Sequence, residues 1–206
     1  MSDKVVIVDV GVGNLRSVEK AVAEAGKELG LVPERTADLD AIRRADRLVV
    51  PGQGEFSELL RRLGSERLEL LKERIAAGVP YFGICVGMQI LFSSSEEAEG
   101  VAGMGVLPGS VQRLQGGGGL KIPHMGWNQL ELRAEGHPFL EAGSWFCFMH
   151  SYHCVPSEAG VVRAVAVYGP NQVTAAVARD NVFATQFHPE KSQRAGLSLL
   201  GRFLRA

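Results

Sequence analysis

The sequence lacks the features that mark several specialised classes of protein. Its longest apolar runs, such as residues 5–8 and 79–84, fall far short of the roughly 20 residues that a membrane-spanning helix needs. It does not begin with a basic segment followed by a long apolar stretch, so we expect no signal peptide and a cytoplasmic location. The net charge is only −1, and Lys and Arg are scattered, which argues against a nucleic-acid or membrane surface.

Cysteine is also scarce. The three residues Cys85, Cys147 and Cys154 are odd in number and show no C-x-x-C spacing. This pattern indicates neither a disulfide framework nor a zinc site. No metal or organic cofactor is expected.

The remaining composition is that of an ordinary globular protein. Hydrophobic residues make up 46% and charged residues 22% of the 206 positions. A chain of this length can bury one full-sized core, so we expect a single domain over residues 1–206.

The first half of the sequence alternates strand and helix signals, which is typical of a parallel sheet wrapped by helices. The expected strands are residues 5–8, 48–50 and 79–84, and the expected helices are one capped by Asn14, stripes over 56–63 and 68–75, and a segment from Cys85 to about Leu91.

The second half contains strand signals with short connections. The expected strands are residues 127–132, 144–152, 161–168, 173–179 and 182–187, and a helix on Leu197, Leu200 and Leu204 closes the chain. Asp180-Asn181 is a hairpin signal between the last two strands. The predicted fold is therefore a three-layer α/β domain, with a mostly parallel central sheet and an antiparallel extension.

One short stretch suggests chemistry. Gly83-Ile84-Cys85-Val86-Gly87 has the G-x-nucleophile-x-G form, with a strand before it and a helix after it. In such an elbow the flanking residues must be small, and the central residue sits at a helix N-terminus that favours a thiolate. The alternative from this pentapeptide alone is a buried cysteine in an ordinary turn.

A thiolate nucleophile needs a base, and His188 is the best candidate of the five histidines. It follows a strand and precedes Pro189-Glu190, so Glu190 can reach one ring nitrogen while the other faces the sulfur. This is the arrangement of a nucleophile–base–carboxylate triad. We expect His137 to lie at the surface, and His150 and His153 to be hydrogen-bonded core residues.

A glycine-rich loop, Pro51-Gly52-Gln53-Gly54, directly follows the strand at 48–50. Such a loop at the end of a parallel strand can aim backbone N–H groups at an anion, although a simple tight turn is the alternative. The loop amide near Gln53, next to Gly52, and the amide of Val86 are the expected pair of oxyanion donors.

Together these motifs resemble a known family. PGQGEF, GICVGMQ and FHPEKSQ, in this order and spacing, look like those of the class I (triad) glutamine amidotransferases, which have a flavodoxin-like central sheet. DVGVGNLRSV, KIPHMGWN and FMHSYH are similar to the subfamily of glutaminase subunits of imidazole glycerol phosphate synthase, in histidine biosynthesis. The resemblance runs from Asp9 to Gln193.

The resemblance implies an activity and its residues. Cys85 would attack the side-chain amide of L-glutamine, His188 would protonate the departing ammonia, and Glu190 would complete the triad. The substrate-binding positions that match the family are Gln89, His150, Ser151 and Tyr152.

The resemblance also implies a partner. In this subfamily a (β/α)₈-barrel cyclase subunit forms a heterodimer with the glutaminase and receives ammonia before it becomes ammonium in water. The residues implied to face that subunit are Asn14, Met125, Trp127 and Lys191.

Three features depart from the wider family. PGQG has one residue more than the usual PGG, and we hypothesise that the Gly52–Gln53 peptide can flip and misdirect one oxyanion donor until the partner docks. The glycine run at 116–119 matches no family motif and suggests a longer loop. His153 stands where a tyrosine or arginine is expected, which leaves that wall of the pocket undefined.

Other functions remain open on the residues alone. A flavodoxin-like cysteine hydrolase is less consistent, because residues 86–100 contain no histidine near the elbow. A glutaminase of pyridoxal phosphate, anthranilate or purine synthesis is disfavoured only by the resemblance of PHMGWN and PEKSQ. An inert binding subunit has no support, since all three triad residue types are present.

Overall fold

The computed structural model describes residues 3–11, 13–117, 119–133 and 136–206. Its main feature is an eight-stranded sheet in the order β2-β1-β3-β4-β13-β12-β11-β8. The strands are β1 (Val5–Val8), β2 (Glu34–Thr36), β3 (Arg47–Gly52), β4 (Tyr81–Cys85), β8 (Glu131–Leu132), β11 (Val162–Tyr168), β12 (Asn171–Arg179) and β13 (Val182–Thr185). Strands β2, β1, β3, β4 and β13 pair in parallel, whereas β12, β11 and β8 extend the sheet in antiparallel fashion.

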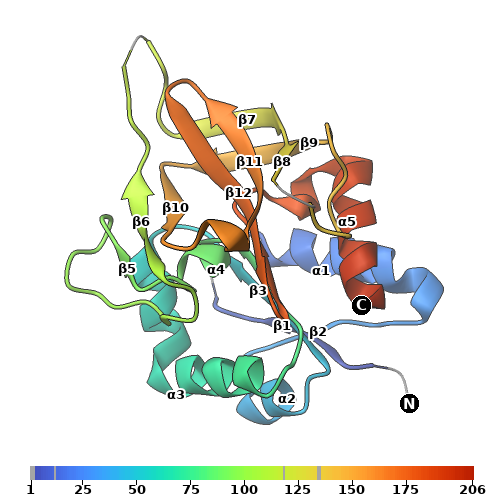
Figure 1. Cartoon of the computed structure of the whole chain (residues 1–206). Helices are drawn as coiled ribbons and strands as arrows, with labels where there is room; N and C mark the ends of the chain where they lie inside the picture. The colour runs from blue at the N-terminus through green and yellow to red at the C-terminus, as the bar shows by residue number, and fades with distance from the viewer. Residues whose placement is uncertain (1–2, 12, 118, 134–135) are drawn as a thin grey trace.

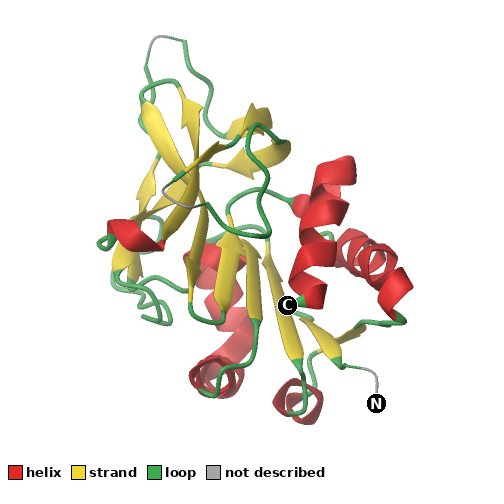
Figure 2. Ribbon diagram, turned by 45° about the vertical axis from the view of Figure 1, so that its right-hand side comes forward, coloured by secondary structure: helices red, strands yellow, loops and turns green. Residues whose placement is uncertain are grey.

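Helices cover both faces of this sheet. Helix α1 packs against α5, and α2 packs against α3. Figure 1 shows α1 and α5 side by side and away from α2 and α3, and Figure 2 shows the strands between the two groups. The helices are α1 (Leu15–Gly26), α2 (Leu39–Arg43), α3 (Phe56–Ala76), α4 (Val86–Gln89) and α5 (Gln193–Arg205), with single 3₁₀ turns at η1 (Lys27–Leu29), η2 (Ala159–Val161) and η3 (Pro189–Lys191).

Burial explains why the central strands read as continuous apolar runs. Every residue of β1, β4 and β13 is buried, because helices close both sides of the sheet. The predicted three-layer α/β fold with an antiparallel extension is therefore confirmed.

Two smaller sheets complete the fold. One has the order β10-β6-β5, and the other is the two-stranded ribbon β7-β9, drawn near the top of Figure 1. Their strands are β5 (Ser94–Ser95), β6 (Gly109–Arg113), β7 (His124–Gln129), β9 (Trp145–His150) and β10 (Tyr152–Pro156). The ribbon contributes the residues that border the site described below.

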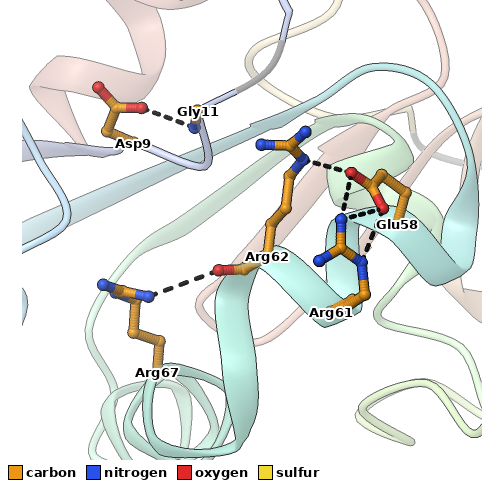
Figure 3. Close-up of polar contacts among 6 residues, drawn as sticks. All are labelled: Asp9, Gly11, Glu58, Arg61, Arg62 and Arg67. Carbon is orange, nitrogen blue, oxygen red and sulfur yellow. Dashed lines mark hydrogen bonds and ion pairs between the residues drawn. The ribbon is translucent and has the colours of Figure 1, made fainter.

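Helix α3 joins the two apolar stripes that the sequence predicts over 56–63 and 68–75. The stripes are separated by a break at Gly64, whose φ of 71° and ψ of 162° are not helical. Figure 3 shows the Arg67 guanidinium reaching across this break to the carbonyl of Arg62, at 3.5 Å. On the exposed turn before it, Glu58 binds Arg61 and Arg62, and the Arg61 hydrogen bond, followed by the Arg62 one, lowers the pKa of this carboxylate.

The same view shows the turn that follows β1. The Asp9 carboxylate accepts a hydrogen bond of 2.8 Å from the backbone N–H of Gly11. Asn14 occupies the N-cap position of α1, as predicted, but its side chain makes no capping hydrogen bond.

Some predicted elements differ from those observed. The strand expected at 127–132 is divided into β7 and β8, which belong to different sheets because β7 pairs with β9 and β8 with β11. The strand expected at 144–152 ends at His150, and β10 begins after it. The helix expected to run to Leu91 ends at Gln89. The hairpin at Asp180-Asn181 is confirmed, with β12 antiparallel to β13.

Of the glycine run at 116–119, Gly118 lies outside the described residues, and Gly117 forms an isolated bridge to Leu120. Within the described part of the chain, none of the helices has the length and apolarity required to span a membrane.

Candidate active site

The elbow at Cys85 has the strained geometry that its sequence predicts. Cys85 ends β4 with a φ of 55°, which L-residues rarely adopt, and α4 begins at the next residue. A Cβ atom at Gly87 would lie 1.9 Å from the carbonyl oxygen of Val50, and one at Gly83 would lie 2.5 Å from that of Gly87. Both flanking glycines are therefore required by close packing. The buried Tyr81 hydroxyl donates a hydrogen bond of 2.9 Å to the Gly87 carbonyl, which stabilises the turn.

Strand register gathers the candidate residues at one edge of the sheet. Gly52 of β3 pairs directly with Cys85 of β4, and Thr185 of β13 pairs with Ile84. The carboxyl ends of three neighbouring strands therefore lie together, which is where α/β sheets bind ligands.

His188 and Glu190 form a buried pair just beyond β13. Nδ1 of His188 lies 2.8 Å from Oε1 of Glu190, and their side chains are only 2% and 1% exposed. Since a carboxylate accepts, Nδ1 carries the proton in this pair. The Pro189 turn η3 brings the carboxylate back to the ring.

The backbone of His188 is held on both sides. Its N–H donates to the carbonyl of Cys147 on β9 at 2.9 Å. Its carbonyl accepts from the hydroxyl of Ser192 at 2.6 Å, and the same hydroxyl oxygen accepts from the N–H of Cys147 at 3.0 Å. The backbone at His188 is thus fixed by the ribbon β7-β9 and by Ser192, the residue before α5.

Cys85 and His188 line one cavity of about 320 Å³. Burial acts to lower the pKa of His188, but the charge of the nearby Cys85 sulfur and the Glu190 carboxylate outweigh it and raise the pKa to about 10. Nε2 of His188 is buried and makes no hydrogen bond to any residue described. This nitrogen is therefore free to exchange a proton with a group in the cavity, opposite the nitrogen that Glu190 occupies.

The cavity has further walls from five segments of the chain. Its remaining lining residues are Gln53, Gly54, Val86, Gln89, Glu97, Pro123, Met149, His150, Ser151 and Tyr152. All four predicted substrate-binding positions are among them, and so are two of the three predicted oxyanion positions.

The third oxyanion position, Gly52, is enclosed rather than exposed to the cavity. A Cβ atom there would lie 2.6 Å from the Leu59 side chain and 2.7 Å from the backbone nitrogen of Gly87. The next residue, Gln53, uses its side-chain oxygen to accept from the N–H of Asn14 at 3.0 Å. The loop that follows β3 is thereby tied to the start of α1.

Several buried polar side chains of the cavity are hydrogen-bonded to each other. The side-chain nitrogen of Gln89 lies 3.1 Å from the carbonyl oxygen of Tyr152 and 3.1 Å from Oε1 of Gln186. Nε2 of Gln186 lies 3.5 Å from the sulfur of Cys85. His150 bonds to the Tyr152 carbonyl through Nδ1 at 2.9 Å.

Two histidines differ from their predicted environments. His153 lines a different cavity, together with Cys154 and Thr174. It therefore does not form the wall of the Cys85 cavity that its sequence position left undefined. His137 is half-buried and stacks on Phe183 with ring centroids 4.8 Å apart, so the prediction that it lies at the surface is wrong.

Sequence reasoning missed two polar residues near the sulfur. Glu97 lines the cavity, and its carboxylate accepts from the N–H of Phe56 at 2.8 Å. Burial raises the pKa of Glu97, although the bond from Phe56 opposes this. Gln186 lies two residues before His188, but a glutamine in a predicted strand has no distinguishing pattern.

The positions predicted to face a partner differ in their exposure. Met125 and Trp127 are 64% and 47% exposed on β7, and Trp145 on β9, which was not predicted, is 53% exposed. Asn14 is exposed, and Lys191 is half-buried in the turn η3. Among the described residues no cluster of three or more His, Cys, Asp or Glu side chains could hold a metal ion.

Comparison with known proteins gives a consistent family. Residues 6–206 match the family described as "Glutamine amidotransferase class-I". The chain is 45% identical over 205 residues to "Imidazole glycerol phosphate synthase subunit HisH" of Synechococcus elongatus, covering 98% of this chain and 92% of the relative. It is 45% identical over 210 residues to the protein of the same name from Methylococcus capsulatus, covering 98% and 95%.

Solved structures agree on the fold. "Structure of PurLQS from Thermotoga maritima" contains a chain that matches with a TM-score of 0.71 at 18% identity, over 100% of this chain and 99% of that one. A structure described as "Crystal structure of glutamine amidotransferase" matches with a TM-score of 0.67 at 23% identity, over 95% of this chain and 98% of that one.

Proposed function

Because this chain belongs to the class I glutamine amidotransferase family, we propose that it is the glutaminase subunit of an imidazole glycerol phosphate synthase in histidine biosynthesis, and that Cys85, His188 and Glu190 are its catalytic residues. The observation that carries the site assignment is the convergence of Cys85 with His188 and Glu190, which come from two distant parts of the sequence. Cys85, whose backbone is strained, and His188, which is hydrogen-bonded to the Glu190 carboxylate, line the same cavity.

The first half of the proposed reaction forms a thioester. The Cys85 thiolate attacks the carboxamide carbon of glutamine, and the C=O electron pair moves onto oxygen. We assign the backbone N–H groups of Val86 and Gln53 as the donors that stabilise this oxyanion. The tetrahedral adduct then collapses, and the C–N bond breaks as Nε2 of His188 gives its proton to the departing ammonia.

The second half releases glutamate. Neutral His188 accepts a proton from water as the oxygen attacks the thioester carbon, and collapse of the second adduct expels the sulfur as thiolate. Glu190 remains ionised throughout, because its role is to hold Nδ1–H and stabilise the charged ring.

Glu97 supplies a reason for choosing an amino acid as substrate. Its carboxylate borders the cavity that contains Cys85, and a carboxylate is the natural partner of an α-ammonium group. We assign Glu97 to the ammonium of glutamine, and the segment His150-Ser151-Tyr152 with Gln89 to the rest of the substrate. We also propose that the whole chain acts as one amidotransferase domain and that it works in the cytoplasm.

The decisive experiment measures ammonia release from glutamine by the purified chain with its cyclase subunit. Cys85→Ala should abolish release, whereas Cys147→Ala, which removes the half-buried thiol of β9, should retain it. Ammonia release that survives in Cys85→Ala would overturn the assignment of the nucleophile.

The exposed face of the ribbon β7-β9 supports the proposal that the chain binds a partner subunit. Met125 and Trp127 alternate onto one face of β7, and Trp145 lies on the same face because it pairs with Gln129. The opposite face carries the buried residues Phe146 and Phe148. A cluster of exposed large apolar side chains indicates an interaction surface, so we propose that this face binds a (β/α)₈-barrel cyclase.

The protonation of ammonia in water explains why a partner subunit is needed. Ammonia released into neutral water becomes ammonium, which is not a nucleophile, so a second subunit must receive it directly. The ribbon borders the cavity, since Pro123 and Met149 line it beside the paired residues of β7 and β9.

A binding measurement tests the surface. Trp127→Ala should weaken cyclase binding at least about 30-fold, the effect of losing a buried aromatic anchor. Val32→Ala is the matched control, because Val32 is 83% exposed in a distant loop. Equal affinities of the two variants would contradict the assignment.

The same complex tests the flipping peptide. If the Gly52–Gln53 amide is misdirected until the cyclase docks, the cyclase must accelerate ammonia release. Equal glutaminase rates with and without cyclase would count against this gating.

A further inference from the structure

Three amide and carbonyl groups form a buried hydrogen-bonded chain that ends at the Cys85 sulfur. The carbonyl oxygen of Tyr152 can only accept, so the side-chain atom of Gln89 that lies 3.1 Å from it must be the NH₂ nitrogen. That nitrogen also lies 3.1 Å from a terminal atom of Gln186. The Gln186 atom must therefore be its oxygen.

The orientation of Gln186 follows by elimination. With its oxygen turned to Gln89, its NH₂ group is the one that lies 3.5 Å from the Cys85 sulfur. An amide NH₂ donates and cannot accept, so the sulfur is the acceptor of this hydrogen bond. A donor at this position favours the thiolate over the thiol, because hydrogen bonds to a charged acceptor are stronger than those to a neutral one.

The end of the hydrogen-bonded series that lies farthest from Cys85 is also fixed. The Tyr152 carbonyl accepts a second hydrogen bond, 2.9 Å long, from Nδ1 of His150. Nε2 of the same ring faces Nδ1 of His124 at 3.1 Å. Since the first bond places the His150 proton on Nδ1, its Nε2 accepts and His124 donates. Burial lowers the pKa of both rings, to about 3 for His150 and about 4 for His124, so both stay neutral near pH 7.

Burial makes this arrangement rigid. Gln186 is 0% exposed and Gln89 only 3%, so neither amide can rotate without leaving a buried polar group unsatisfied. The backbone N–H of Gln186 is bound to the carbonyl of Ala175 on β12 at 2.9 Å.

We propose that Gln186 is a further catalytic residue, which donates a hydrogen bond to the Cys85 sulfur and stabilises its thiolate, and that Gln89 and the Tyr152 carbonyl fix the amide in the donating orientation. The proposal rests on the proposed function for the role of Cys85 as nucleophile. It gives Gln89 a second task besides substrate binding, since its amide nitrogen is engaged by Tyr152 and Gln186.

The test measures the rate of Cys85 alkylation by iodoacetamide as a function of pH in the full chain, with the modified peptide quantified by mass spectrometry. Gln186→Met keeps the side-chain volume and removes the donor. Its alkylation midpoint should move up by about one pH unit, which lowers the thiolate fraction on the acid side about tenfold. With the higher plateau described below, the acid-side alkylation rate should fall about threefold.

The alkaline plateau provides a second readout. A more basic thiolate is a better nucleophile, so the plateau rate of Gln186→Met should rise about threefold above that of the parent chain. Loss of access to the sulfur would lower the plateau instead, and loss of fold would expose the buried Cys154 to alkylation as well. A lower plateau with an unchanged midpoint would overturn the proposal.

Two further variants complete the design. Gln89→Met should move the midpoint in the same direction by less, and adding it to Gln186→Met should move the midpoint no further, because both act through one bond. Thr185→Val is the matched control: it removes a buried hydroxyl of the same strand that bonds only to the Phe187 carbonyl at 3.0 Å, and it should leave the midpoint unchanged.

A midpoint that Gln186→Met leaves unchanged would refute the role of Gln186. This outcome differs from failure of the proposed function, which would be the absence of glutamine hydrolysis by the parent chain with its cyclase. The alkylation assay needs neither glutamine nor cyclase, so each idea can fail alone.

Discussion

A single added methyl group at Gly87 should separate the elbow from the strand beside it. In Gly87→Ala the new Cβ would lie 1.9 Å from the carbonyl oxygen of Val50 and 3.0 Å from its carbonyl carbon. Val50 is 0% exposed and lies in β3, which is paired on both sides, to β1 and to β4. The strand cannot yield, so α4 must move outward by about 1 Å to restore a normal contact.

This displacement has two costs. Overpacking of a buried site lowers the free energy of unfolding by about 1–3 kcal/mol. The amide of Val86 and the sulfur of Cys85 move with the elbow, and a 1 Å misplacement of reacting groups costs about 100-fold in rate. Ammonia release should therefore fall far more than the loss of folded protein explains.

The measurements are glutaminase rate and urea unfolding of the same preparation. Gly160→Ala is the control, because a Cβ atom there meets nothing within 4 Å and its φ lies outside the left-handed region. It should keep full activity and change stability by less than about 1 kcal/mol. A Gly87→Ala protein with normal rate and stability would refute the claim that close packing shapes the elbow.

Three other perturbations test separate parts of the molecule. In Glu190→Gln the loss of the carboxylate lowers the pKa of His188, so the alkaline limb of the pH–rate profile should move down by about 1–3 pH units; an unmoved limb would exclude Glu190 from the triad. Burial lowers the pKa of His150 to about 3 in the folded protein, so as the pH falls below about 6.5 the unfolded chain binds a proton at this residue and the folded chain does not. The free energy of unfolding should therefore fall by up to about 1.4 kcal/mol per pH unit, and His150→Gln should reduce this slope in urea titrations between about pH 6.5 and 4.5. Asn181→Ala removes two hydrogen bonds, of 2.9 and 2.7 Å, to carbonyls at the end of α3 and should cost about 1–2 kcal/mol in urea unfolding while leaving glutaminase activity intact.

Patterns that depend on the backbone were predictable from the sequence. The continuous apolar runs of β1, β3 and β4 identify strands buried on both faces, and they are confirmed. The family resemblance from the motifs around Cys85 and His188 is likewise confirmed by the comparisons.

Pairing partners were less predictable, because periodicity shows which face of a strand is buried but not which strand lies beside it. β7 and β8 read as one strand in the sequence, although one pairs with β9 and the other with β11. The two-residue strand β5 is too short to carry any alternation.

Side-chain contacts at the site were the hardest to foresee. Gln186 contacts Cys85 only because β13 is in register with β4, and Glu97 reaches the cavity from an irregular segment after β5. Neither residue belongs to a pattern with a fixed spacing, so neither could be identified from composition or periodicity.

The position of β13 has a consequence for synthesis of the chain. β13 lies near the C-terminal end of the sequence, yet it sits in the interior of the large sheet between β4 and β12. A growing polypeptide therefore contains Cys85, the proposed nucleophile, long before His188, its proposed base. Until residues 182–185 leave the ribosome, β4 and β12 each have a bare edge, which invites pairing with other nascent chains. On the proposed mechanism, the protein can become active only when nearly all of it has been made.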